Sequence, residues 1–77
     1  MKVTLESTTK IVELTLNGQT LPARVWEGAT EHGIRCHAYI TRIAVDPSLD
    51  ATEFEKDLQA HRTPSAAIEA IPARLIL

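Results

Sequence analysis

The side chains best suited to ligand chemistry in this sequence are arginines and aromatic residues that recur at alternate positions. Two segments show the pattern, Arg24-Val25-Trp26 and Arg35-Cys36-His37-Ala38-Tyr39. Alternate residues of a β-strand share one face of a sheet, so each segment would present these side chains together. Guanidinium groups bind phosphate oxygens, and flat rings stack on nucleobases. The pattern therefore predicts a surface for a ligand that carries phosphates and bases.

Whether the two segments share one face depends on the register between their strands. We expect the apolar residues Cys36, Ala38 and Ile40 to align with the apolar layer of the first two strands. That alignment places on the opposite face Arg24, Trp26, Arg35, His37 and Tyr39. After Thr41-Arg42 the apolar residues change parity, to Ile43 and Val45, and we expect Arg42 to reach the same face from this parity switch. A slip of one residue across Gly28–Gly33 would send the second segment to the other face.

Other interpretations of these side chains stay open. Trp26 can pack under a helix with Phe54, and the arginines can pair with nearby carboxylates, namely Glu13, Glu27 or Glu31. Arginine, tryptophan and tyrosine are also enriched at protein–protein hot spots. The same face can therefore serve as an interface between subunits or with another protein.

Catalytic and metal chemistry find little support in the sequence. Cys36 and His37 are neighbours in an expected strand and point to opposite faces, so they form no dyad. Together with His32 they do not match the spacing of a closed zinc site. The acidic pairs Glu27/Glu31 and Glu53/Asp57 are expected on solvated surfaces, and the three glycines are all expected in turns. We therefore expect a non-enzymatic protein with no catalytic residue, metal or cofactor.

The first half of the chain predicts strands. Val3–Leu5 and Lys10–Leu16 alternate apolar and polar residues, and Ser7-Thr8-Thr9 interrupts them. Asn17-Gly18 predicts a type I′ hairpin turn, with a returning strand over Gln19–Glu27. The turn sets Leu16 opposite Gln19, Leu14 opposite Leu21, Val12 opposite Ala23, and Glu13 opposite Pro22 in a pair without hydrogen bonds. A long strand over Ile34–Val45 follows the loop Gly28–Gly33.

The second half predicts one helix. Asp50 and Glu53 have the spacing of a capping box, and Leu49 and Phe54 that of a hydrophobic staple, so a helix is expected over 51–61. Ser65–Ile71 is either a short helical turn or an extended arm, and Ala73–Leu77 is expected as a closing strand. The fold class is α+β: a mostly antiparallel sheet of four or five strands with one helix.

Composition limits the class of protein. The 77 residues, 44% hydrophobic and 23% charged, predict a single globular domain over 1–77. No apolar run spans a membrane, no signal peptide is recognisable, and one cysteine suits a reducing compartment, so we expect a cytoplasmic protein. A net charge of −2 argues against membrane and bulk DNA binding. Three aromatic residues make a thin core, which predicts a homo-oligomer, a dimer or larger.

Five segments resemble a group of short phage and prophage proteins: PARVWEG (22–28), GI (33–34), ITRIA (40–44), FEKDL (54–58) and AIPARL (70–75). The resemblance assigns no role to any residue and implies only a context, counter-defence by binding inside the host cell. We therefore expect a protein that sequesters a nucleotide-type signal or a short oligonucleotide at a subunit interface. The alternative is an inhibitor of a host protein, or a small structural module, that binds no small molecule.

Overall fold

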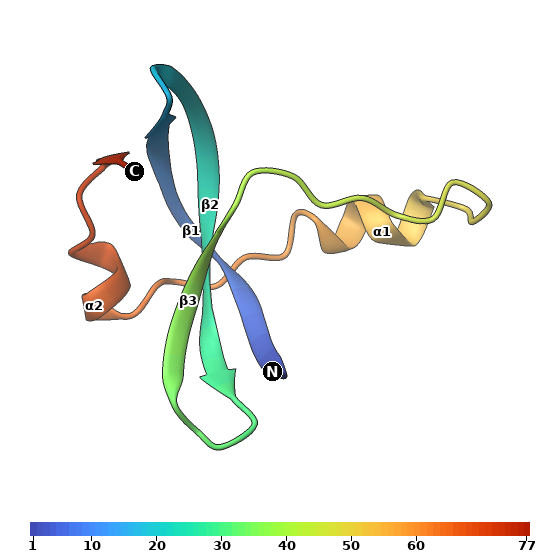
Figure 1. The fold of residues 1–77 in the computed structure, drawn as a ribbon. Coiled ribbons are helices and arrows are strands. Elements are labelled where there is room, and N and C mark those ends of the chain that lie inside the picture. The colour runs from blue at the N-terminus through green and yellow to red at the C-terminus, as the bar shows by residue number, and fades with distance from the viewer.

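The computed structural model describes residues 1–77, and its four strands form one sheet in the order β3-β2-β1-β4 (Figure 1). The strands are β1 (Val3–Leu16), β2 (Gln19–Thr30), β3 (Arg35–Ile40) and β4 (Arg74–Ile76), and the helices are α1 (Thr52–Asp57) and α2 (Ala66–Glu69). Strand β4 runs parallel to β1 and the other pairs are antiparallel, so the sheet is mixed. The expected fold class holds in a coarse form: a small, mostly β domain with two short helices.

The first hairpin has the predicted turn and register. Asn17 and Gly18 adopt φ angles of 49° and 79°, as a type I′ turn requires. Leu14 lies opposite Leu21, and Glu13 lies opposite Pro22. The apolar layer is therefore on one face of the hairpin, and Arg24 and Trp26 are on the other.

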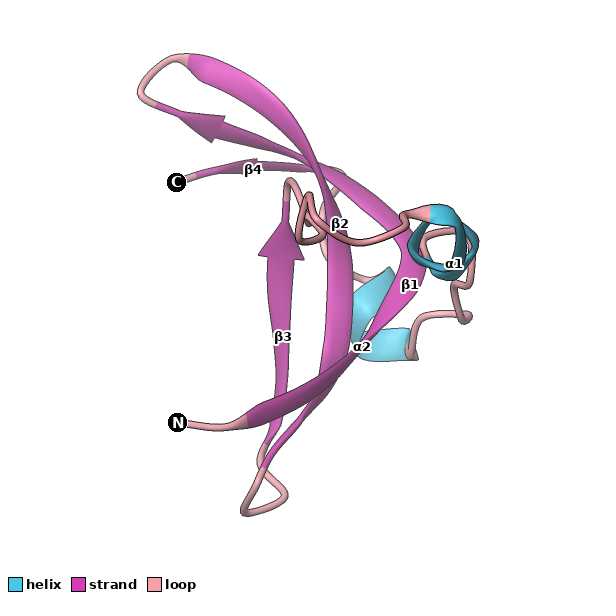
Figure 2. Cartoon of the chain, turned by 90° about the vertical axis from the view of Figure 1, so that its right-hand side faces the viewer, coloured by secondary structure: helices cyan, strands magenta, loops and turns pink.

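A bulge in β1 replaces the interruption expected between two strands. The register against β2 shifts between Ser7 and Ile11, so β1 is one strand with extra residues in its middle. Thr8 lies in the bulge, is fully buried, and donates a hydrogen bond of 2.7 Å from Oγ1 to the Val25 carbonyl. Such a bulge bends the strand and increases its twist, and the sheet is visibly curled (Figure 2).

The loop between β2 and β3 is shorter than expected and reverses the predicted face of β3. Strand β2 continues to Thr30, so Gly28 lies in a strand and not in a turn. The Thr30 N–H donates to the Ile34 carbonyl at 2.9 Å, and Gly33 closes the three-residue loop with φ of 80°. Because the loop has three residues, each even-numbered residue of β3 pairs with an even-numbered residue of β2, and paired residues lie on the same face of the sheet. Tyr39 therefore lies opposite Val25, not beside Trp26.

Strand β3 ends at Ile40, five residues before the predicted end at Val45. Arg24 pairs with Ile40, so the next partner on β2 would be Pro22 facing residue 42. Proline has no N–H to donate on that side, and the ladder stops there. The parity switch at Ile43 thus marks the end of the strand.

Helix α1 is shorter than the predicted 51–61, and its capping box does not form. The N-cap is Ala51 without a side-chain hydrogen bond. Asp50 instead accepts from the N–H and hydroxyl of Thr52 at 2.9 and 2.7 Å, and Glu53 pairs with Lys56 at 3.5 Å. The two bonds from Thr52 lower the pKa of Asp50 below its ordinary value. Neither helix has the length or the apolar composition that a membrane-crossing helix needs.

The core lies on one face of the sheet, under α2. It consists of five buried apolar residues, Val12, Leu14, Ala23, Val25 and Ile68, with Tyr39, Ile71 and Leu75 packed at its margin. Ser65 caps α2 through its hydroxyl, and Ile68 fills the space over the sheet. The expectation of a thin aliphatic core is confirmed, since seven of 77 residues are buried in total.

The molecule exposes more surface than a compact chain of its mass. A compact protein of 8.5 kDa has an accessible surface of about 4650 Å², whereas this chain has 5892 Å², an excess of about 1200 Å². Its radius of gyration is 13.8 Å, against about 11.5 Å for a compact domain of this length. The excess is as large as the area that one subunit contributes to a stable interface.

Gly28 is required by the approach of β1 to β2. A Cβ atom at this position would overlap the carbonyl oxygen of Thr4, which is backbone and cannot rotate away. We predict that Gly28→Ala lowers the free energy of unfolding by at least about 3 kcal/mol in urea titrations, at the upper end of overpacking costs. Gly18→Ala is the control: nothing lies within 4 Å of its added Cβ, and only the positive φ is strained, which costs about 1–2 kcal/mol. Equal losses in the two variants would contradict the close approach.

Candidate functional site

A groove separates the sheet from residues of the segment that follows β3. We call residues 41–61, which include α1, the arm, and the space between arm and sheet the arm groove. Its volume is about 450 Å³. Its lining includes Ser7, Ile11, Arg24, Trp26 and Ile40 from the sheet, and Arg42, Ile43, Phe54, Asp57, Leu58 and His61 from the arm. Figure 1 shows the arm projecting from the sheet on the side opposite α2.

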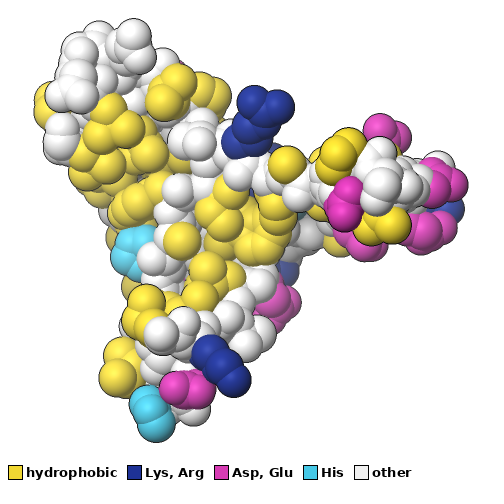
Figure 3. Space-filling view, turned by 45° about the vertical axis from the view of Figure 1, so that its right-hand side comes forward, with side chains coloured by type: hydrophobic (Ala, Val, Ile, Leu, Met, Phe, Trp, Pro, Cys, Tyr) yellow, Lys and Arg dark blue, Asp and Glu magenta, His cyan; other side chains and the backbone are white.

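The centre of the groove is apolar and its margin is charged. Trp26 and Ile40 are half-buried on the sheet, and Phe54 and Leu58 are half-buried on the arm. Apolar side chains gather at the centre of this view, while acidic side chains cluster at the end of the arm (Figure 3). The groove therefore offers flat apolar surfaces to a ligand, with guanidinium groups beside them.

Three of the six predicted binding residues line the groove. They are Arg24, Trp26 and Arg42. The Arg24 guanidinium donates from Nη1 to the Thr8 carbonyl at 2.8 Å, which fixes it over the bulge and leaves it further N–H donors. Arg42 is exposed. The two arginines enter the groove from different elements, β2 and the arm.

The other three predicted residues, Arg35, His37 and Tyr39, do not join them, and the expectation of a single shared face is wrong. The register of β3 places these three on the face of Val25 and Glu27, which α2 covers. There the His37 Nε2 and the Tyr39 hydroxyl lie 3.1 Å apart, with the rings edge to face. The signal that predicts this register is Gly33, because a three-residue hairpin loop needs a left-handed residue at its last position.

A serine and a histidine meet at the root of the arm, a pair that spacing along the chain does not reveal. Ser7 Oγ lies 3.0 Å from His61 Nδ1 and donates to the Ala60 carbonyl at 2.9 Å. The hydroxyl proton thus points at a carbonyl oxygen rather than at the imidazole. The arrangement fastens the arm to β1, and it lacks the oriented base that nucleophilic catalysis needs.

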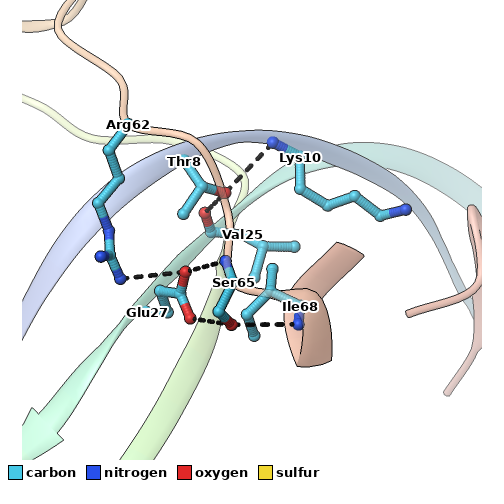
Figure 4. Close-up of polar contacts among 7 residues, drawn as sticks. All are labelled: Thr8, Lys10, Val25, Glu27, Arg62, Ser65 and Ile68. Carbon is cyan, nitrogen blue, oxygen red and sulfur yellow. Dashed lines mark hydrogen bonds and ion pairs between the residues drawn. The ribbon is translucent and has the colours of Figure 1, made fainter. Parts of the chain in front are cut away.

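Glu27 fixes the point where the chain crosses the sheet, contrary to the solvated position predicted for it. Its carboxylate is buried and accepts from the N–H and the hydroxyl of Ser65, both at 2.7 Å. Arg62 completes the cluster with an ion pair of 3.0 Å (Figure 4). Arg62 also exchanges backbone hydrogen bonds with Ser7 and Thr9 in the bulge. Along the chain, the arm ends just before Arg62 and α2 begins just after Ser65.

The electrostatics of Glu27 favour its ionised form. Burial by itself raises the pKa of this carboxyl. The hydrogen bonds from Ser65 and the positive charges of Arg62 and Arg35 outweigh burial, and the pKa lies below its ordinary value of 4.5. The structure holds no group of three or more histidine, cysteine or acidic side chains placed to bind a metal ion.

The lowered pKa predicts a dependence of stability on pH. The ionised Glu27 stabilises the fold above pH 4.5, and this contribution is lost as the pH falls through the lower folded pKa. We predict that Glu27→Gln lowers the free energy of unfolding at pH 7 by about 3 kcal/mol. The difference from the wild type should shrink as the pH is lowered, in thermal melts between pH 7 and pH 3.

Glu13→Gln is the matched control. Glu13 pairs with Arg74 at 3.4 Å, and both side chains are at least half exposed. Such a surface pair contributes below about 1 kcal/mol. Equal destabilisation by the two substitutions would contradict the role of the Glu27 cluster.

Comparison of the chain with protein-family models, with curated proteins and with solved structures finds no match. The resemblance to short phage proteins therefore stays a prediction, and the site is interpreted from its own geometry.

Proposed function

We propose that the protein is a small binding protein that captures a nucleotide-type ligand in the arm groove. The observation that carries the proposal is the meeting of Trp26 with Arg24 and Arg42 around one apolar groove, with Phe54 across from the sheet. An indole ring can stack on a base, and guanidinium groups can bind phosphate oxygens. The groove volume of about 450 Å³ lies within the usual range of small-ligand sites.

The charge distribution favours a short ligand over a long polyanion. The net charge is −2, and the arm carries the acidic residues Asp46, Asp50, Glu53, Glu55 and Asp57. Asp57 lines the groove itself, and the other four do not line it and would repel a nucleic acid that extended beyond it. A ligand with one or a few phosphates can instead be held at Arg24 and Arg42 alone.

The biological role we propose is sequestration of a host signal during phage infection. The resemblance to short phage proteins supports this context. A sequestering protein needs only affinity and abundance, which a chain of 77 residues can supply.

A second candidate function is protein interaction without a small-molecule ligand. The observation that favours it is the exposure of ten large apolar side chains, Met1, Val3, Ile11, Leu16, Leu21, Ile34, Ile43, Leu49, Ile76 and Leu77. Where such side chains are contiguous on the surface, they mark an interaction surface.

Tryptophan fluorescence tests the ligand proposal directly, because Trp26 is the single tryptophan of the chain. Titration with a panel of cyclic nucleotides and short oligonucleotides is expected to quench it for the true ligand class. A ligand at a concentration of about 100 times its dissociation constant should raise the free energy of unfolding by about 2.7 kcal/mol, which thermal melts would detect. Arg42→Ala should weaken binding by one to two decades, from the loss of about 1.5–3 kcal/mol.

Arg35→Ala is the matched control, because Arg35 is an exposed arginine on the opposite face of the sheet. It should leave affinity unchanged, whereas Trp26→Leu should keep the fold and lose the stacking contact. High salt should weaken binding, since phosphate contacts are screened. If no member of the panel stabilises the protein, or if Arg35→Ala and Arg42→Ala weaken binding equally, the arm groove is not the site.

A further inference from the structure

The outer edge of β3 is a row of unpaired backbone groups. Strand β3 is the last strand of the sheet on its side. The bond from Thr30 N–H to the Ile34 carbonyl fixes which residues of β3 turn toward β2. Since the direction alternates along a strand, Cys36, Ala38 and Ile40 bond to β2. The N–H and C=O groups of Arg35, His37 and Tyr39 therefore point outward, and Figure 2 shows β3 at one side of the sheet with both helices toward the other.

This edge has few of the features that normally prevent strand addition. Natural edge strands are kept apart by charged side chains, above all lysine, and by prolines, bulges or shortness, and Arg35 is the one charged side chain of this kind in β3. Strand β3 has six residues, contains no proline or lysine, and pairs with β2 without a register shift. On the opposite side of the sheet, β4 has only three residues and begins two positions after Pro72. The β3 edge is thus the open one.

The chain has enough excess accessible surface to form an interface with a second subunit. The excess of about 1200 Å² over a compact chain exceeds the roughly 800 Å² that each partner contributes to a standard interface. Ile34, which directly precedes β3, adds an apolar side chain that is 64% exposed. A surface of this size and composition needs a partner that is always available to cover it, and a second copy of the chain is always available.

The sequence of the edge is complementary to itself. When two copies of β3 pair antiparallel about His37, each Arg35 lies opposite the other subunit's position 39, a tyrosine. A guanidinium against an aromatic ring is a favourable contact, and the two arginines are kept apart. Each facing pair of outward residues exchanges two backbone hydrogen bonds.

We propose that two copies of the protein pair through their β3 edges, antiparallel and centred on His37, into one continuous eight-stranded sheet. The two-fold axis is perpendicular to the sheet, so both arm grooves open on one face and both α2 helices lie on the other. This assembly does not depend on the ligand proposed for the groove. It completes the sheet on the side where each chain leaves it open.

Analytical ultracentrifugation at micromolar concentration tests the assembly. We expect a mass of 17 kDa, twice the 8.5 kDa of the chain. His37→Pro removes an N–H that has no partner within the chain, so the monomer should fold while the dimer dissociation constant rises about tenfold or more. A monomer at all concentrations, or a dimer that His37→Pro leaves unchanged, would overturn the proposal.

Disulfide trapping tests the register and does not depend on the proline variant. In Cys36→Ala/His37→Cys, the two introduced thiols face each other across the axis, with Cα atoms about 5.5 Å apart, and mild oxidation should yield a covalent dimer. The control is Cys36→Ala/Arg35→Cys, whose cysteines would be separated by about 14 Å, too far to bridge. Equal cross-linking of the two variants, or none in the first, would show that β3 does not pair in this way.

Discussion

The fold depends on one buried carboxylate. Glu27 is the only acidic side chain in the interior, and an unpaired charge there would cost several kcal/mol. Its oxygens are satisfied by Ser65 and Arg62, which belong to a segment far along the chain. That segment crosses β1 at the bulge, where the Arg62 backbone bonds to Ser7 and Thr9. The carboxylate therefore decides where the chain passes from one face of the sheet to the other.

This crossing determines what covers each face. Before Arg62 the chain forms the arm, which lies over Trp26 and Ile40 without any fully buried side chain. After Ser65 it forms α2, whose Ile68 closes the core over Val12 and Val25. One face is thus packed and the other is only partly covered. The same anchor that completes the small core leaves a groove on the far side, and the groove and the excess surface have a common cause.

The local elements were predictable from the sequence, whereas the long-range ones were not. Asn17-Gly18 specifies its turn and the register beside it, since two residues with positive φ leave few alternatives. The helix was predicted too long at its C-terminal end, where Gln59 and Ala60 donate to carbonyls only three residues back and Ser7 then bonds to the Ala60 carbonyl. Nothing in the local pattern of Glu27 indicates that Ser65, 38 positions away, will bury it. Of the six candidate site residues, Arg24, Trp26 and Arg42 share the groove because their placement needs only the first hairpin and the end of β3.

The division of the candidate residues follows from the length of one loop. With three residues between Thr30 and Ile34, odd-numbered residues of β3 lie on the same face of the sheet as odd-numbered residues of β2. One residue more or fewer in this loop would move every side chain of β3 to the other face. In the observed register Ile40 lines the groove and Ala38 lies opposite Trp26 on the same face, while Arg35, His37 and Tyr39 turn to the face of the core. The sheet side of the groove is consequently apolar around Trp26, and Arg24, Arg42 and Asp57 are the charged residues of its lining. The same register sends the backbone of the three polar residues outward along the open edge. One glycine at the end of a short loop thus selects both the chemistry of the groove and the residues exposed at the rim of the sheet.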